Sequence, residues 1–269
     1  MSQGKGWKRN LLAGAALAVL ALGVSGCANK RLTTGSISTP SLSKPIDSMN
    51  AGELAGASQK LGQAYARDPK NRDTAITYAR VLMMRNQTDQ ALAVMRKTAI
   101  YHASDRGVLA AYGKSLAAAG QFEQALDAIR RAQTPEYPDW KLVSAEAAIL
   151  DQLGQTDNAR TLYNKALTIQ PGEPSVLSNL GMSYVINGDL ASAERYLRQA
   201  ASAQGSDSRV RQNLALVVGL QGRFQEAEQI AAQELDPAQA QANVTYLRSI
   251  LAQQNSWTKL ADKDKKATN

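Results

Sequence analysis

Few side chains in this sequence are of the types that catalyse reactions, and their spacing does not favour catalysis. His102 is the single histidine, and no serine or cysteine motif lies near it. Glu146 and Asp151 could act as an acid and base pair, but five positions apart on a helix they diverge, so we expect both on the solvated surface. The sequence has no glycine-rich phosphate loop and no histidine pair at metal-ligand spacing. It therefore predicts a protein that is not an enzyme, with no metal, no cofactor and no small-molecule substrate.

The residue whose surroundings do indicate chemistry is Cys27, the only cysteine. Basic residues precede an apolar run, residues 11–22, which is too short to span a bilayer comfortably and has the anatomy of a signal peptide. Residues 24–27, Val-Ser-Gly-Cys, resemble the lipobox of bacterial lipoproteins. The resemblance implies that residues 1–26 are removed and that Cys27 is lipidated, with palmitate among its acyl chains. The alternative is a buried or free thiol, since a single cysteine can build neither a disulfide nor a zinc site.

The lipoprotein resemblance also indicates where the protein resides. In that family an aspartate after the lipidated cysteine favours retention in the inner membrane, and Ala28 stands at that position. The resemblance thus implies a lipid anchor in the outer membrane, facing the periplasm. Residues 27–49 are rich in Ser, Thr, Gly and Pro and have little to bury, so we expect a lipidated flexible tether.

The elements beyond the tether repeat at a fixed interval of 34 residues. Five alanines stand at this interval, and the position five residues before each is glycine in all repeats but the first. Such a period means one supersecondary unit copied in series. The alanines are Ala91, Ala125, Ala159, Ala193 and Ala227, and the earlier position holds Asn86, Gly120, Gly154, Gly188 and Gly222.

These positions have a steric and conformational logic for paired helices. Small residues such as Gly181 and Ala193 allow two antiparallel helices to approach closely. Glycine or asparagine before the alanine suits a chain reversal with left-handed backbone angles. Acidic or amide residues precede each first helix and can cap its amide hydrogens. The predicted caps are Asn71, Asp105, Asp139, Glu173 and Asp207.

The fourth repeat shows the pattern most completely, with Leu180, Gly181, Tyr184, Gly188, Ala193, Leu197 and Ala200. This pattern resembles the tetratricopeptide repeat family. The resemblance implies an all-α fold, an α-solenoid that winds as a right-handed superhelix, with five full repeats. Arg211 and Glu234 depart from the family pattern and make the fifth repeat the least regular.

Both ends of the array are predicted to be capped. Residues 50–67 form a half repeat with a capping box of Asn50 and Glu53, and residues 238–254 form an amphipathic closing helix. We expect the solenoid to occupy residues 50–258 and a basic disordered tail to follow at residues 259–269.

In this family the first helices line a groove that accepts segments of partner proteins. The family positions carried onto this sequence predict a partner-binding groove, although some of these aliphatic residues could instead be core between repeats. The N-terminal part of the groove is Arg80, Met83, Met84, Lys114 and Lys141. The C-terminal part is Ser178, Asn179, Met182, Val185, Ile186, Arg209, Gln212, Asn213, Leu216 and Leu220.

The charge of the chain allows several partners. The formal net charge is +8, but export and the lack of aromatics interleaved with arginines argue against nucleic acid. An arginine cluster around the fourth and fifth repeats is either a solvated face or a site for acidic partners or lipid headgroups. It comprises Arg195, Arg198, Arg209, Arg211 and Arg223.

Lipobox, polar tether, repeats and the closing stretch at residues 243–260 together resemble the repeat lipoproteins of Tad (Flp) pilus assembly. The resemblance implies a periplasmic scaffold that helps to assemble or localise the pilus secretin, with the secretin or other Tad assembly proteins as partners. The alternative is a general outer-membrane biogenesis or cell-envelope adaptor.

Overall fold

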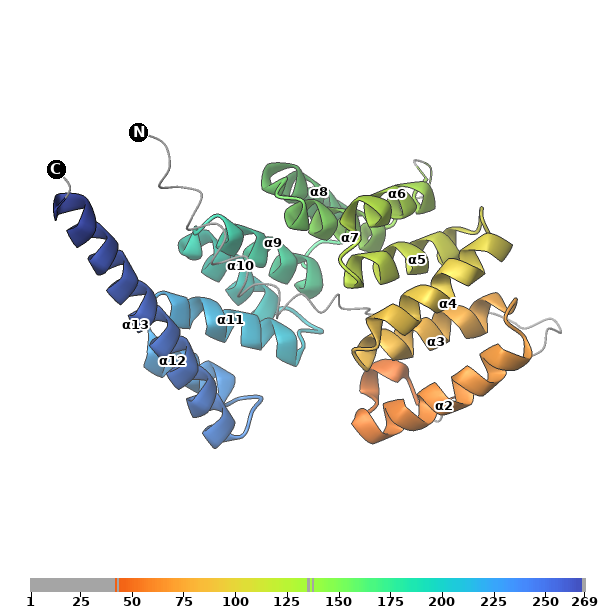
Figure 1. Cartoon of the computed structure of the whole chain (residues 1–269), viewed down its shortest axis with the longest axis horizontal. Helices are drawn as coiled ribbons and strands as arrows, with labels where there is room; N and C mark the ends of the chain where they lie inside the picture. Colours follow the sequence, from red (N-terminus) through yellow and green to blue (C-terminus); the bar gives the residue numbers. More distant parts are fainter. Residues whose placement is uncertain (1–41, 43, 135, 137, 268–269) are drawn as a thin grey trace. The chain divides into compact units, whose positions relative to one another are not determined.

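A computed structural model describes residues 42, 44–134, 136 and 138–267 of the 269 residues, with side chains described as far as residue 253. Cys27, the predicted signal peptide and most of the predicted tether lie outside the described residues. Every regular element in the described part is helical, which confirms the all-α fold class. The described chain divides into two compact units, residues 42–169 and residues 170–267 (Figure 1).

Each unit is a series of helical hairpins, in which a first helix packs antiparallel to a second (Figure 1). The N-terminal unit contains η1 (Ile46–Ser48), α2 (Ala51–Arg67), α3 (Arg72–Met84), α4 (Thr88–Tyr101), α5 (Arg106–Ala118), α6 (Phe122–Ala132), α7 (Trp140–Gln152) and α8 (Thr156–Ile169). The C-terminal unit contains α9 (Pro174–Ile186), α10 (Leu190–Ser202), α11 (Ser208–Leu220), α12 (Phe224–Ala231) and α13 (Pro237–Ala267).

The turns inside the hairpins have the left-handed backbone that the sequence predicts. Gly120, Gly154, Gly188 and Gly222 have φ between 76° and 84°, and Asn86 has φ of 59°. Asn86 is the one non-glycine residue with positive φ in the described part of the chain. Because asparagine is the residue that best tolerates this conformation after glycine, the sequence exception and the backbone agree.

Close packing between the two helices of a hairpin explains the small residues. The five repeating alanines are completely buried. A Cβ at Gly181 would lie 2.8 Å from Cγ of Leu197 and 3.1 Å from the carbonyl oxygen of Ala193, and Gly113 is equally tight against Ile129. A side chain at either position would therefore push the helices apart.

All five predicted caps of the first helices are present. The side chains of Asn71, Asp105, Asp139, Glu173 and Asp207 each accept a hydrogen bond from a backbone N–H in the first turn of α3, α5, α7, α9 or α11. The capping box of Asn50 and Glu53 at the start of α2 is also formed. The helix starts are thus determined by residues that the sequence shows directly.

The two ends of the described chain hold more structure than the sequence predicts. Residues 44–49, assigned above to the tether, include η1, whose Ile46 is buried against α2 and α3. At the other end, α13 continues to Ala267 through a stretch expected to be a disordered tail. Ala, Leu and Lys are good helix formers and neither Gly nor Pro occurs in this stretch, so nothing in it stops the helix.

Candidate partner-binding surface

The residues considered for catalysis have structural roles instead. Glu146 accepts hydrogen bonds from Nε of Arg130 at 2.8 Å and from Nε2 of Gln133 at 2.7 Å. Asp151 is buried, not solvated as the sequence suggested, and its contact with the hydroxyl of Tyr163 helps to raise the pKa of that tyrosine, after the larger effect of burial. His102 places Nε2 at 2.8 Å from the carbonyl oxygen of Lys70, one repeat earlier.

The described residues also lack two other kinds of functional feature. In this part of the chain no three His, Cys, Asp or Glu side chains gather as metal ligands would. None of its helices combines the length and the apolar character that crossing a bilayer requires.

In the N-terminal unit, the predicted groove residues lie on three first helices that contact one another in sequence, α3, α5 and α7. Met83 on α3 is half-buried and accepts a contact from the hydroxyl of Ser115 on α5, with 3.8 Å between Oγ and Sδ. Met84 is 40% exposed. We call Arg80 on α3, Lys114 on α5 and Lys141 on α7 the cationic row.

Arg80 is paired within the chain. Its guanidinium donates hydrogen bonds to both carboxylate oxygens of Asp47 in η1. The neighbouring Ile46 is buried in a cluster with Leu54, Leu61 and Val81. Sequence reasoning missed this contact, because Asp47 lies in a polar segment outside the repeats.

Lys114 is half-buried, and it makes no hydrogen bond or ion pair to any residue that the structure describes. Burial lowers the pKa of its ammonium group; Asp139 opposes this shift, and the positive charges of Lys141 and Arg80 add to it. Lys141 holds its ammonium 5.4 Å from the ring centre of Trp140. The charges of the cationic row are therefore close enough to repel one another.

In the C-terminal unit, four of the predicted groove residues lie in the interior. Asn213 is buried and donates from Nδ2 to Oγ of the equally buried Ser178 at 3.1 Å, which joins α11 to α9. Met182 and Val185 are buried among aliphatic residues of α11. For these four side chains the structure favours the core alternative. Asn179, Ile186, Arg209, Leu216 and Leu220 are partly exposed, and Gln212 is exposed.

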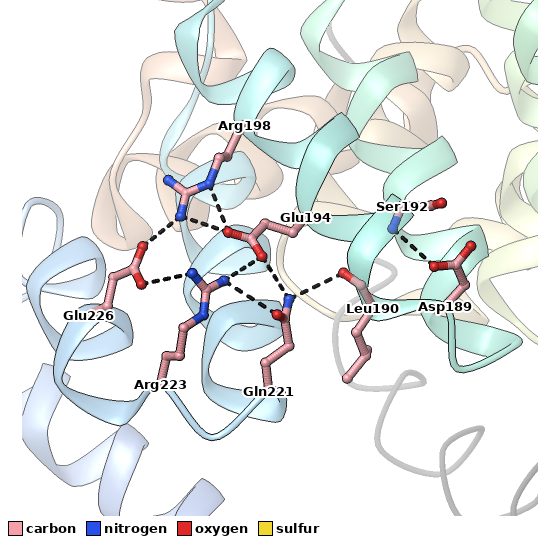
Figure 2. Close-up of polar contacts among 8 residues, drawn as sticks. All are labelled: Asp189, Leu190, Ser192, Glu194, Arg198, Gln221, Arg223 and Glu226. Carbon is pink, nitrogen blue, oxygen red and sulfur yellow. Dashed lines mark hydrogen bonds and ion pairs between the residues drawn. The ribbon is translucent and has the colours of Figure 1, made fainter.

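The arginine cluster of the fourth and fifth repeats is neutralised internally. Figure 2 shows what we call the arginine network, made of Glu194, Arg198, Gln221, Arg223 and Glu226. Arg198 contacts Glu194 at 2.8 Å from its Nε and Glu226 at 2.5 Å, and Arg223 contacts the same two glutamates. The network joins α10 to the start of α12.

Glu194 is the centre of this network (Figure 2). It accepts from both arginines and, at 2.8 Å, from Nε2 of Gln221. The hydrogen bond from Arg223, with those from Gln221 and Arg198, lowers the pKa of Glu194 to about 2 against the opposing effect of burial. An arginine network with its own carboxylates does not need an acidic partner.

The other arginines of the cluster have neighbours of their own. Arg195 stacks over the ring of Tyr196 at 4.1 Å, and Arg209 pairs with Asp207 at 3.3 Å. Arg211 pairs with Glu234, so the two departures of the fifth repeat from the family pattern contact each other. That both departures occur in the same repeat was the available sequence signal for this pair.

A depression of about 530 Å³ lies beside the network, on α12 and α13. Its lining includes Arg223, which the network holds, and Arg248, whose guanidinium lies 4.6 Å from the ring centre of Phe224. Both cations are therefore already engaged.

Comparison with known proteins identifies the architecture. Two profiles described as tetratricopeptide repeat match the chain, one over residues 48–115 and 150–217 and one over residues 110–174. No protein of curated function matches the sequence.

Solved structures give the same result. PilW, described as a widely conserved type IV pilus biogenesis factor, has a TM-score of 0.57 at 20% identity, over 74% of this chain and 91% of its own. A thermophilic tetratricopeptide repeat protein of Thermus thermophilus has a TM-score of 0.54 at 20% identity, over 62% of this chain and 91% of its own. A chain of the APC/C Cut9–Hcn1 complex has a TM-score of 0.55 at 15% identity, over 72% of this chain and 40% of its own. At these identities the likeness establishes the fold alone.

Proposed function

Because this chain belongs to the tetratricopeptide repeat family, we propose that it is an outer-membrane-anchored periplasmic scaffold that binds partner proteins in pilus biogenesis. The observation that carries the binding role is the fold itself. Stacked hairpins present rows of first-helix side chains, and the described residues that could have formed a catalytic pair, Glu146 and Asp151, are held in structural contacts.

The proposal of an anchor rests on the sequence around Cys27. The apolar run and the lipobox-like residues 24–27 support export and lipidation, and Ala28 supports the outer membrane. Lipidation by several acyl chains would give a firm anchor, since each buried methylene contributes about 0.8 kcal/mol.

The proposal of a pilus role, as a protein of the TadD kind, rests on the combination of lipobox, tether, repeats and closing stretch. PilW, which shares the fold, is described as a pilus biogenesis factor. We propose that the partner is the secretin of a Tad (Flp) pilus or another Tad assembly protein. A general outer-membrane biogenesis or envelope adaptor is the second candidate, because the same fold and anchor would serve it.

A deletion of the gene tests the pilus role. We expect secretin multimers in the outer membrane to fall while secretin monomer remains, and the wild-type gene to restore them. Unchanged multimers would contradict the pilus role, and a broad loss of porins or cell-wall enzymes would favour the adaptor.

The anchor is tested by two variants in the deletion strain. Cys27→Ser removes the thiol that is lipidated, and Ala28→Asp keeps the lipid but should retain the protein in the inner membrane. We expect neither to restore secretin multimers, and fractionation should find the second variant in the inner membrane. Full restoration by Cys27→Ser would show that no anchor is needed.

A further inference from the structure

We propose that Lys114 and Lys141, which continue the cationic row beyond the Arg80–Asp47 pair, bind the carboxylates of an acidic, extended segment of the partner protein. This inference rests on the proposed scaffold role and adds the chemistry of the bound segment. It is independent of whether that partner is a secretin.

The spacing of the row suits an extended chain. Arg80 and Lys114 occupy the same position of consecutive repeats, 34 residues apart, on first helices that contact each other. Packed helices have axes about 10 Å apart. An extended segment rises about 3.3 Å per residue, so residues three positions apart would pass successive first helices, among them α5 with Lys114 and α7 with Lys141.

The electrostatics of the row favour an anion. Lys114 is half-buried beside two other cations, and Asp139 is the one carboxylate that acts in its favour among the residues described, without forming an ion pair. A partly buried charge without a partner is unfavourable, and a carboxylate placed beside it removes much of that cost. Asp139 is also already engaged, since its carboxylate caps α7 at the N–H of Lys141.

The chain itself shows how an acidic segment engages this row. In the segment that contains η1, Asp47 accepts two hydrogen bonds from Arg80 while the adjacent Ile46 is buried against α2 and α3. An acidic residue next to an apolar one is thus bound at the first cation. No carboxylate of the described residues makes the equivalent contact with Lys114 or Lys141.

The arginine network shows that a general excess of cations does not explain why Lys114 lacks a carboxylate partner. Arg198 and Arg223 each have two carboxylates of their own (Figure 2). The chain therefore supplies acidic partners where cations serve to join repeats, and its described part supplies none to Lys114.

The test uses the purified full-length protein and a fluorescent peptide with aspartate or glutamate at every third position, in an anisotropy titration. We expect saturable binding that weakens with salt, and about tenfold weaker binding for Lys114→Met, the loss expected for one charge-assisted hydrogen bond. Lys97→Met is the matched control, because Lys97 is exposed on α4 and the charge change is the same. It should leave the affinity unchanged.

Two further probes decide between acidic protein and other anions. The amide version of the peptide, with Asn and Gln in place of the acids, should not bind. Vesicles that contain phosphatidylglycerol should bind the wild type and Lys114→Met equally, since the lipid anchor lies elsewhere in the chain. Three results would overturn the inference. The acidic and amide peptides could bind equally, or neither Lys114→Met nor Lys141→Met could weaken peptide binding. Alternatively, Lys114→Met could weaken binding to the vesicles and leave binding to the peptide unchanged.

The inference and the proposed function fail in different ways. If deletion of the gene lowers secretin multimers but Lys114→Met restores them fully and binds the peptide normally, the scaffold role stands and the row is not its binding site. If the peptide binds through Lys114 while deletion leaves the multimers unchanged, the row stands and the pilus role falls.

Discussion

The arginine network of the C-terminal unit and the cationic row of the N-terminal unit have similar side chains but differ in how completely carboxylates of the chain compensate their charges. In the network, Arg198 and Arg223 share Glu194 and Glu226, and all four charges are compensated (Figure 2). In the row, Lys114 is half-buried with its pKa lowered, first by burial and then, against Asp139, by two neighbouring cations. Cations that join repeats carry their own acids, and a cation without one is available for an acid from another molecule.

The comparison predicts its largest effect at Glu194, the shared acceptor. Glu194→Gln should lower the free energy of unfolding by about 2 kcal/mol, because hydrogen bonds to charged groups contribute about 1.5–3 kcal/mol and this site is partly solvated. Urea unfolding at neutral pH measures it. Glu228→Gln makes the same charge change on α12 at a residue outside the network, and should cost less than about 0.5 kcal/mol. Equal losses in both variants would show that the network contributes nothing specific.

Acid should remove the contribution of the network in a defined window. The pKa of Glu194 is about 2 in the folded protein against 4.5 for an unperturbed glutamate, so the folded state binds fewer protons than the unfolded state between these values. The stabilisation is complete above pH 4.5 and is lost as the pH falls towards 2. Unfolding measured across this window should show a shallower loss in Glu194→Gln than in the wild type. If the free energy of unfolding falls equally with pH in both proteins, groups other than Glu194 cause the acid sensitivity.

The pair Arg211 and Glu234 offers a smaller test of internal compensation. Both side chains are about three-quarters buried and contact each other. Arg211→Glu and Glu234→Arg should each destabilise the protein by about 1 kcal/mol, and the double variant should regain more than half of the summed loss. A double-mutant cycle by thermal unfolding measures the coupling. If the losses simply add, the two departures from the repeat pattern are unrelated.

The sequence predicted what is decided within one or two turns of chain. The positive φ of Asn86, the caps such as Asp105, and the close approach at Gly181 depend on residues a few positions apart or on the 34-residue period, and all are confirmed. The burial of Met182 and Asp151 depends on how far each helix is rotated towards its neighbour. The family positions do not specify that rotation. The predicted groove therefore included both core residues and surface residues.

The ion pairs could not be predicted from the sequence for a related reason. The sequence shows Arg198 as one of a cluster of arginines, but it does not show its partner, because Glu226 is 28 residues away on another helix. Asp47 was missed since it precedes the repeats, and the lack of a partner for Lys114 among the described residues becomes visible only when its neighbours are placed. Which cations are free to bind is therefore a tertiary property.

The smallest predicted effect on stability is at Lys114. It best distinguishes a lysine that serves a partner from one that stabilises the fold. With its folded pKa lowered, the ammonium group costs free energy at every pH below that pKa, so its removal should not destabilise the fold. Lys114→Met keeps the apolar stem and removes the charge, and we expect the free energy of unfolding to stay equal or to rise by up to about 0.5 kcal/mol. Urea unfolding beside Glu194→Gln gives the comparison directly. A loss at Lys114 as large as that at Glu194 would mean that the lysine is a structural group like the arginines, because residues kept for a partner stabilise the complex and leave the isolated chain no more stable.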